Sequence, residues 1–202
     1  MKVLIVLDHP RRDSLTGAVA DKLAEGLKAG GHVPEIADLH REGFDPRMKV
    51  EDEPIWGDKT QTFSEELLEQ QARVDRNDAI AFVFPVWWWG FPAMTRGWIE
   101  RVWNQGWAHG WGRMNQSKGL ILGVAADNAP SFAKRNYEPS MKTLMLTGIV
   151  HYCGIEEGRF ELLYDSLTSP EHQKILLDRA FELGETFETS VTEKQAYNPL
   201  KS

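Results

Sequence analysis

The stretch AIAFVFPVWWWGFPAMTRGWIERVW, residues 79–103, decides the fold expected for this chain. It opens with an apolar run, Ala79 to Phe84, whose length and lack of polar alternation are typical of a strand buried on both faces of a sheet. An aromatic turn between two prolines follows, and Pro92 to Trp103 then carries apolar residues at helical spacing. A strand, a turn and a helix in this order indicate one unit of an α/β sheet.

The rest of the chain repeats this order of strand and helix. Four more short apolar runs predict strands: Val3 to Leu7, Val33 to Ala37, Gly119 to Ala126 and the weaker Arg159 to Tyr164. Apolar stripes predict further helices at Ser14 to Ala29, Phe63 to Asp75 and Pro139 to Tyr152. The pattern predicts an α/β fold with a doubly wound, five-stranded parallel sheet and helices on both faces. In such a sheet, ligands bind beyond the carboxyl ends of the strands.

Composition limits the possible partners and the compartment. The 202 residues hold 30 acidic and 23 basic side chains, a net charge of −7 that argues against nucleic acid or an anionic lipid surface as a partner. Cys153 is the only cysteine, so neither an intrachain disulfide nor a cysteine metal site can form, and a cytoplasmic location is expected. The apolar run after Met1 is too short for a signal sequence. The six histidines show no metal-binding spacing, so no metal is expected.

The length favours one domain, expected over residues 1–190, with a polar C-terminal tail over 191–202. Two segments are longer than ordinary connections. One runs from Leu39 to Thr62, and the other, rich in glycine and tryptophan, runs from Gln105 to Gln116. Long loops in a compact domain are often functional, so both are candidates for a role at a site.

The loop after the first predicted strand is a candidate anion site. Ser14 and Thr16 lie at the start of a predicted helix, where unpaired amides and the helix dipole favour a phosphate, and His9 and Arg11 lie nearby. An alternative is that Asp13 or Ser14 only caps the helix and that His9 is a solvated loop residue. The glycine signatures of dinucleotide-binding and ATPase phosphate loops are absent from this stretch.

Tryptophan is concentrated in one part of the chain. Seven of the eight tryptophans lie between Trp87 and Trp111. A flat ring ligand explains this clustering, because backbone amides of a proline-rich turn can bond its polar edge while an indole covers its face. A tryptophan-rich dimer interface is the alternative, and the two explanations are compatible.

Residues 84–103 resemble the signature of the NAD(P)H quinone reductases, a group that includes the modulator-of-drug-activity proteins and the ancillary reductases of glutathione-gated potassium efflux. Residues 7–16, 38–46 and 148–154 resemble further segments of the same family, in the family's order. The resemblance spans about residues 2–190 and implies a flavodoxin-like fold.

The resemblance also implies roles for individual residues. The flavin's phosphate and ribityl end would be held by His9, Ser14, Leu15 and Thr16, and its isoalloxazine would be lined by Pro85, Val86, Trp87, Trp88 and Trp89. The third flavin loop, usually Thr-Thr-Gly-Gly, here contains Ala125, Ala126 and Asp127, which lose the close approach that glycine permits and add a negative charge.

The substrate pocket of the family corresponds to Trp107, Ala108 and His109 in this chain. His109 is expected to be a catalytic polar contact, although an exposed loop histidine is an equally open interpretation. Tyr137 is the nearest candidate for the tyrosine that often contributes to the family's active site.

The implied activity is two-electron transfer from NAD(P)H through a flavin to a quinone-like acceptor by a ping-pong sequence, in a homodimer. Either FAD or FMN is expected, with a preference for FAD because of the long segment from Leu39 to Thr62. Two alternatives remain open at this point. One is a regulatory ancillary subunit in peripheral contact with a membrane potassium-efflux transporter, and the other is a one-electron carrier like flavodoxin.

Overall fold

The computed structural model describes residues 1–195 and contains a six-stranded sheet with the order β2-β1-β3-β4-β5-β6. The strands are β1 (Lys2–Leu7), β2 (Val33–Asp38), β3 (Ala79–Pro85), β4 (Lys118–Val124), β5 (Glu157–Leu163) and β6 (Glu193–Lys194). Every neighbouring pair is parallel except β5 with β6. The first five strands have the order of flavodoxin-like sheets, so the predicted fold class is confirmed.

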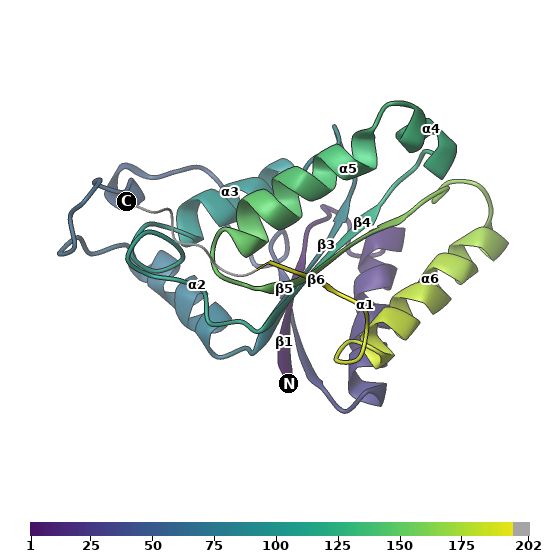
Figure 1. The fold of residues 1–202 in the computed structure, drawn as a ribbon, viewed down its shortest axis with the longest axis horizontal. Coiled ribbons are helices and arrows are strands. Elements are labelled where there is room, and N and C mark those ends of the chain that lie inside the picture. The colour runs from purple at the N-terminus through teal and green to yellow at the C-terminus, as the bar shows by residue number, and fades with distance from the viewer. Residues whose placement is uncertain (196–202) are drawn as a thin grey trace.

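Helices cover both faces of the sheet (Figure 1). They are α1 (Leu15–Ala29), α2 (Glu65–Asp75), α3 (Ala93–Val102), α4 (Ala129–Lys134), α5 (Tyr137–Lys142) and α6 (Pro170–Glu185), with a 3₁₀ turn η1 (Val50–Asp52) and a π-helical segment η2 (Thr143–His151). α1 and α6 pack on one face, and α2, α3, α5 and η2 lie on the other. None of these helices is long and apolar enough to cross a membrane, in the part of the chain described here.

The alternation of side chains along the central strands builds two cores. In β1, Val3, Ile5 and Leu7 face α1 and α6, whereas Leu4 and Val6 face the opposite layer. β1, β3 and β4 are covered on both faces, as their continuous apolar runs predict, because a parallel sheet in a doubly wound fold has helices on each side. The edge strand β2 is only partly buried.

The strand count differs from the prediction of five parallel strands. Glu193 and Lys194, expected in the polar tail, form a sixth strand antiparallel to Glu157 and Gly158. A two-residue strand leaves no periodic pattern in a sequence, so this addition could not be anticipated. The remainder of the expected tail, 196–202, lies outside the described residues.

Helix α6 is also absent from the sequence-based prediction, although it forms much of one layer. Leu176, Ala180 and Leu183 of α6 pack into the core shared with α1. Gly26 and Gly184 allow the two helices to approach closely, because a methyl group at either position would overlap the other helix's backbone. The single helix predicted over 139–152 is instead α5 followed by η2.

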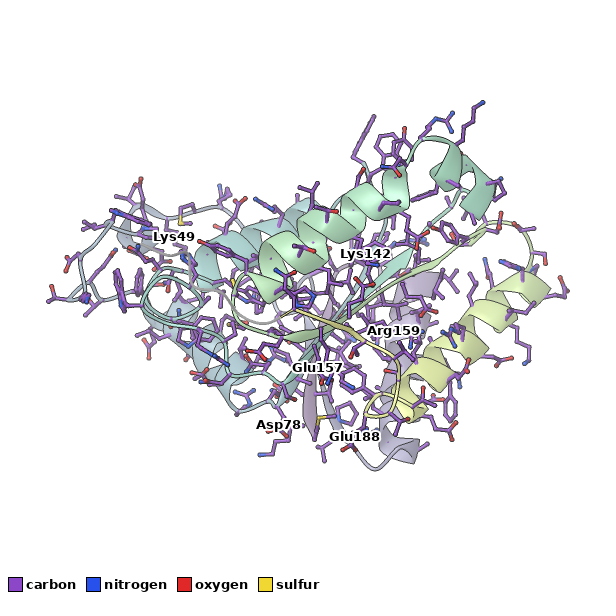
Figure 2. All side chains as sticks on the ribbon, in the orientation of Figure 1. Lys49, Asp78, Lys142, Glu157, Arg159 and Glu188 are labelled. Carbon is purple, nitrogen blue, oxygen red and sulfur yellow. The ribbon has the colours of Figure 1, made fainter. Side chains whose placement is uncertain are left out.

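The long segment after β2 is tied to the layer of α2 and α3 by a buried arginine. Arg101 donates to Asp52 and to Glu66, at 2.8 Å each, and to the Asp45 carbonyl. Figure 2 shows Lys49, also in this segment and paired with Glu66 at 2.7 Å, on the side of the molecule where α2 and α3 lie. The segment is therefore an ordered part of the fold.

Candidate functional site

A cavity of about 550 Å³ lies at the carboxyl ends of β1, β3 and β4. β1 and β3 are neighbours in the sheet, yet the helices that follow them, α1 and α3, cover opposite faces. The cavity therefore lies at the switch point of the sheet, where doubly wound folds bind ligands. Its walls are formed by His9, Arg11, Asp13, Ser14, Leu15, Thr16, Ala18, Pro85, Val86, Trp87, Val124, Ala126, Ser166, Leu167, Gln173 and Leu177.

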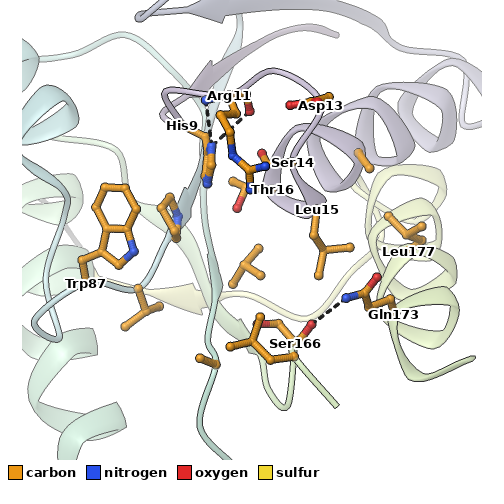
Figure 3. Close-up of a pocket in the computed structure, with 16 residues that line it drawn as sticks. His9, Arg11, Asp13, Ser14, Leu15, Thr16, Trp87, Ser166, Gln173 and Leu177 are labelled. Carbon is orange, nitrogen blue, oxygen red and sulfur yellow. Dashed lines mark hydrogen bonds between the residues drawn. The ribbon is translucent and has the colours of Figure 1, made fainter. Parts of the chain in front are cut away.

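The start of α1 gives the cavity a set of hydrogen-bond donors. Ser14 is the N-cap residue, and its Oγ accepts a hydrogen bond from the Gly17 amide at 3.1 Å. The amides of Leu15 and Thr16 belong to the first helical turn, where no carbonyl of the same helix can accept from them. Ser14 thus caps the helix and also lines the cavity, so its capping role is compatible with a place in the candidate anion site (Figure 3).

His9 lies at the same mouth of the cavity in a neutral form. Its Nδ1 lies 3.0 Å from both the amide nitrogen and the carbonyl oxygen of Arg11, so the loop backbone engages this ring nitrogen in either tautomer. Burial lowers the pKa of His9 below its ordinary value of 6.5, so the ring is uncharged at neutral pH. The imidazole and the Trp87 indole have centroids 6.0 Å apart, and together they form one end of the cavity (Figure 3).

The turn after β3 holds its tryptophans in a strained backbone. Trp88 and Trp89 both have φ of 53°, in the left-handed region that bulky residues rarely adopt, and a bridge between Trp87 and Gly90 closes the turn. Trp88 is 87% exposed. Strain of this kind persists only where the surrounding structure imposes it, and it concentrates at functional sites.

Eight of the predicted cofactor-binding residues line the cavity, and four do not. The eight are His9, Ser14, Leu15, Thr16, Pro85, Val86, Trp87 and Ala126; the four are Trp88, Trp89, Ala125 and Asp127. The Ala125 amide donates a hydrogen bond to the Leu163 carbonyl at 2.8 Å. The Asp127 carboxylate accepts from the Ser131 hydroxyl, which lowers its pKa, so its charge is directed toward the start of α4.

The predicted substrate residues lie away from the cavity. Trp107 donates from Nε1 to Asp75 at 3.2 Å, Ala108 is buried in the core, and none of Trp107, Ala108 and His109 lines the cavity. His109 is half-buried, and its ring lies 5.8 Å from that of Tyr152. Burial lowers the pKa of His109, so it is neutral at pH 7.

Tyr137, the other predicted catalytic residue, lies beside the tryptophan turn. Its ring lies 4.3 Å from that of Trp89 at an interplanar angle of 30°. It does not line the cavity of this chain, but it supports the turn that does.

Sequence reasoning missed the far end of the cavity. Ser166, Leu167, Gln173 and Leu177 line it from the loop after β5 and from α6, and Gln173 donates to the Ser166 carbonyl at 3.0 Å (Figure 3). Signals for this end exist: Ser169 followed by Pro170 is typical of a helix start, and a loop after β5 must emerge at the same sheet edge as the other sites.

The residues present fit a flavin phosphate and ring. The amide donors in the first turn of α1, together with His9 and the Arg11 guanidinium, match a phosphate group. Val86, Trp87 and Val124 give apolar surface that matches a flat ring system. Across residues 1–195, no group of three or more His, Cys, Asp and Glu side chains lies together as a metal site requires.

Comparisons with known proteins agree with this fold. Residues 1–187 match the family model described as flavodoxin-like fold. An uncharacterised NAD(P)H oxidoreductase of Escherichia coli (strain K12) is 33% identical over 168 residues, which are 82% of this chain and 85% of that protein. NAD(P)H dehydrogenase [quinone] 1 of Cavia porcellus is 25% identical over 81% of this chain and 68% of its own length.

Solved structures extend the same relationship. An NAD(P)H:quinone oxidoreductase from Methanothermobacter marburgensis superposes with a TM-score of 0.90 and 29% identity, over 95% of this chain and 98% of that one. An FMN-dependent NADH-azoreductase of Bacillus anthracis, solved with FMN, has a TM-score of 0.67 and 14% identity over 94% and 98% of the two chains, so this likeness shows the fold alone. The chain belongs to the flavodoxin-like family that contains the NAD(P)H quinone oxidoreductases.

Proposed function

We propose that this protein is a flavin-dependent NAD(P)H oxidoreductase that passes two electrons to quinones or similar small acceptors. The observation that supports it best is the cavity at the β1/β3 switch point, where phosphate donors and an aromatic wall meet in one space. A flavin bound there supplies hydride acceptance and two-electron donation, and the family resemblance implies a ping-pong sequence in which nicotinamide and quinone use one pocket in turn.

The chain's own groups would bind, orient and shield. His9, Ser14 and Thr16 would hold the phosphate end. Val86 and Trp87 would cover one part of the ring and exclude water from it. Trp88, Trp89, Ala125 and Asp127 stay proposals from the family resemblance, because they do not line the cavity of a single chain.

A homodimer forms part of the proposal. Trp107 and His109 do not reach the cavity of their own chain, so a role for them at a substrate pocket requires a second copy. Exposed aromatic surface supports such an interface, since Trp88, Trp111 and Tyr152 are each more than a third exposed. Sedimentation of the purified protein tests it, because a monomer at micromolar concentration would contradict it.

The choice of flavin stays open between FMN and FAD. The expected preference for FAD depends on the segment from Leu39 to Thr62, and no residue of this segment lines the cavity. The structure therefore does not support FAD over FMN. We propose a cytoplasmic location because Cys153 is a free thiol; burial raises its pKa to about 12, which keeps it protonated and unreactive. The role of an ancillary subunit for a potassium-efflux transporter stays a prediction from resemblance alone.

One experiment tests the activity. Purified protein is incubated with FMN or with FAD, freed of excess flavin, and assayed for NADPH and NADH oxidation with and without a quinone. We expect oxidation that depends on both flavin and quinone. A protein that retains flavin but oxidises neither nicotinamide would contradict the proposed reaction while leaving the binding site in place.

A further inference from the structure

A buried carboxylate lies directly behind the cavity and belongs to none of its walls. Asp8 is the first residue after β1 and precedes His9, and its side chain is 1% exposed. Its Oδ2 accepts from the Thr95 amide and from the Thr95 hydroxyl, each at 2.7 Å, and its Oδ1 accepts from His40 Nε2 at 2.9 Å. The three bonds explain how an ionisable group tolerates burial here.

The two bonds from Thr95 give the first turn of α3 a hydrogen-bond acceptor. The N-cap position of α3 is Pro92, which has no side-chain acceptor for the first-turn amides. Asp8, 87 residues before Thr95 in the chain, supplies that acceptor from another element. A carboxylate at a helix N-terminus is also favoured by the helix dipole, so the arrangement is a cap across two segments of the fold.

The cap fixes one end of the strained tryptophan turn. The turn enters from β3, where the Val86 amide donates to the Val124 carbonyl at 2.9 Å, and it leaves through Pro92 into α3. Positive φ at both Trp88 and Trp89 is a conformation that is disfavoured for bulky L-residues. A strained turn keeps its shape only when both of its ends are held, and Asp8 holds the end that continues into α3.

We propose that Asp8 is a positioning residue of the cavity. Its carboxylate joins the loop that carries His9 to the helix that ends the Trp87 turn, and so fixes the spacing between the phosphate-binding wall and the aromatic wall. The identity of the ligand as a flavin rests on the proposed function. The mechanical part, that one carboxylate orders two loops, does not depend on any ligand.

The chain contains a matched control for this inference. Asp52, fully buried, accepts from the Ser64 amide at 2.8 Å and from the Ser64 hydroxyl at 2.9 Å, and it pairs with Arg101 at 2.8 Å. Like Asp8, it accepts from an amide and a hydroxyl at a helix start and contacts a basic side chain. Unlike Asp8, it has no chain neighbour in the cavity wall.

The test measures amide hydrogen exchange in ligand-free Asp8→Ala, Asp8→Asn and Asp52→Ala. We expect Asp8→Ala to raise exchange about tenfold or more in both 9–16 and 86–96, the factor that loss of one charge-assisted bond corresponds to. Asp8→Asn, whose amide oxygen still accepts from Thr95, should restore part of the protection. Asp52→Ala should raise exchange around 50–66 and leave both loops unchanged.

Two results would overturn the inference. One is exchange in Asp8→Ala that rises only in the first turn of α3 while 9–16 stays as in the wild type, and the other is an even rise over the whole chain. If Asp8→Ala does not fold, Thr95→Val replaces it, because this variant removes only the hydroxyl donor. It should raise exchange in the same two segments by a smaller factor, and unchanged exchange there would also overturn the inference.

Titration with FMN separates this inference from the proposed function. The dissociation constant should rise roughly tenfold in Asp8→Ala and stay within about twofold of wild type in Asp52→Ala. Equal affinity in Asp8→Ala and wild type would reject Asp8 as a positioning residue. Wild-type protein that binds neither FMN nor FAD would reject the flavin site alone, since the exchange data still decide whether Asp8 orders the loops.

Discussion

The two ends of α3 use similar chemistry for different purposes. At its start, Thr95 donates to the buried Asp8, beside the loop that lines the cavity. In its last turn, Arg101 donates to the buried Asp52 and fastens the segment after β2 to the helix layer. Both clusters surround a buried carboxylate with hydrogen bonds, but only the first adjoins the cavity. The comparison teaches that similarly bonded buried carboxylates can lie beside a candidate site at one end of a helix and serve stability alone at the other.

The largest expected effect is on the free energy of unfolding, at the last turn of α3, where Arg101 pairs with Asp52. Arg101→Met removes the cationic partner of the fully buried Asp52, which keeps its hydrogen bonds from Ser64, whereas Glu66 keeps its pair with Lys49. Breaking such a buried pair costs about 3 kcal/mol of unfolding free energy. Urea unfolding measures the loss, and the variant should bind FMN like the wild type wherever it is folded. A folded Arg101→Met protein with weakened FMN binding would break the proposed division between the two ends.

Two glycines, one beside the cavity loop and one beside the segment after β2, allow the same comparison, because an added methyl group would overlap the backbone at each. A methyl group at Gly17 would overlap the Arg12 carbonyl in the cavity loop, and one at Gly97 would overlap the Pro46 carbonyl in the long segment. Each alanine variant should lose roughly 1–3 kcal/mol of stability through overpacking. FMN titration beside thermal unfolding should show weakened binding only for Gly17→Ala. Equal FMN affinity of the two variants would contradict the account.

Two helix caps give a smaller contrast. Ser14 caps α1 at the cavity and Ser64 caps α2 away from it, each accepting from the amide three residues later. Ser14→Ala should cost about 1 kcal/mol of unfolding free energy. Ser64→Ala should cost more, because the Ser64 hydroxyl also donates to the buried Asp52 at 2.9 Å. Ser14→Ala should also weaken FMN binding, and Ser64→Ala serves as its control. If both caps cost stability and neither changes FMN affinity, Ser14 has no binding role.

The smallest expected effect is the pH dependence of stability. Burial lowers the pKa of His9 below 6.5, so the unfolded chain binds a proton first and stability declines as the pH falls below about 6.5. Burial alone would raise the pKa of Asp52, but hydrogen bonds from Arg101 and Ser64 hold it below 3.8, so its contribution is lost only at more acidic pH. Chemical unfolding across pH 3–8 measures both effects. The loss of stability below about pH 6.5 should be smaller in His9→Gln, and the loss at the acidic end should be smaller in Asp52→Asn. Identical profiles for the two variants would refute these assignments.

Much of the fold follows from the sequence, because β1, β3 and β4 are central strands whose apolar runs need no tertiary information. The start of α1 was also predictable, since Ser14 caps it as local chemistry dictates. β6 was not predictable, because two residues pair only once β5 is in place. α6 had local signals at Ser169 and Pro170 that the prediction did not use.

The lining of the cavity was predictable where one loop carries it and not where folding assembles it. His9, Ser14 and Thr16 share one loop and one helix start, so adjacency in sequence gave adjacency in space. Gln173 and Leu177 reach the cavity only through the packing of α6 against α1, which no local motif encodes. Asp8 is adjacent to His9, yet its bond to Thr95 depends on two strands meeting in the sheet.

The central claim, that the cavity at the β1/β3 switch point binds a flavin, is tested most directly by titrating the purified protein with FMN and with FAD. The titration follows quenching of flavin fluorescence, with Trp87→Ala and Ser64→Ala titrated in parallel. The account predicts saturable binding of at least one flavin by the wild type and by Ser64→Ala, and markedly weaker binding by Trp87→Ala. Binding of neither flavin by wild-type protein, or equal binding by all three proteins, would contradict it.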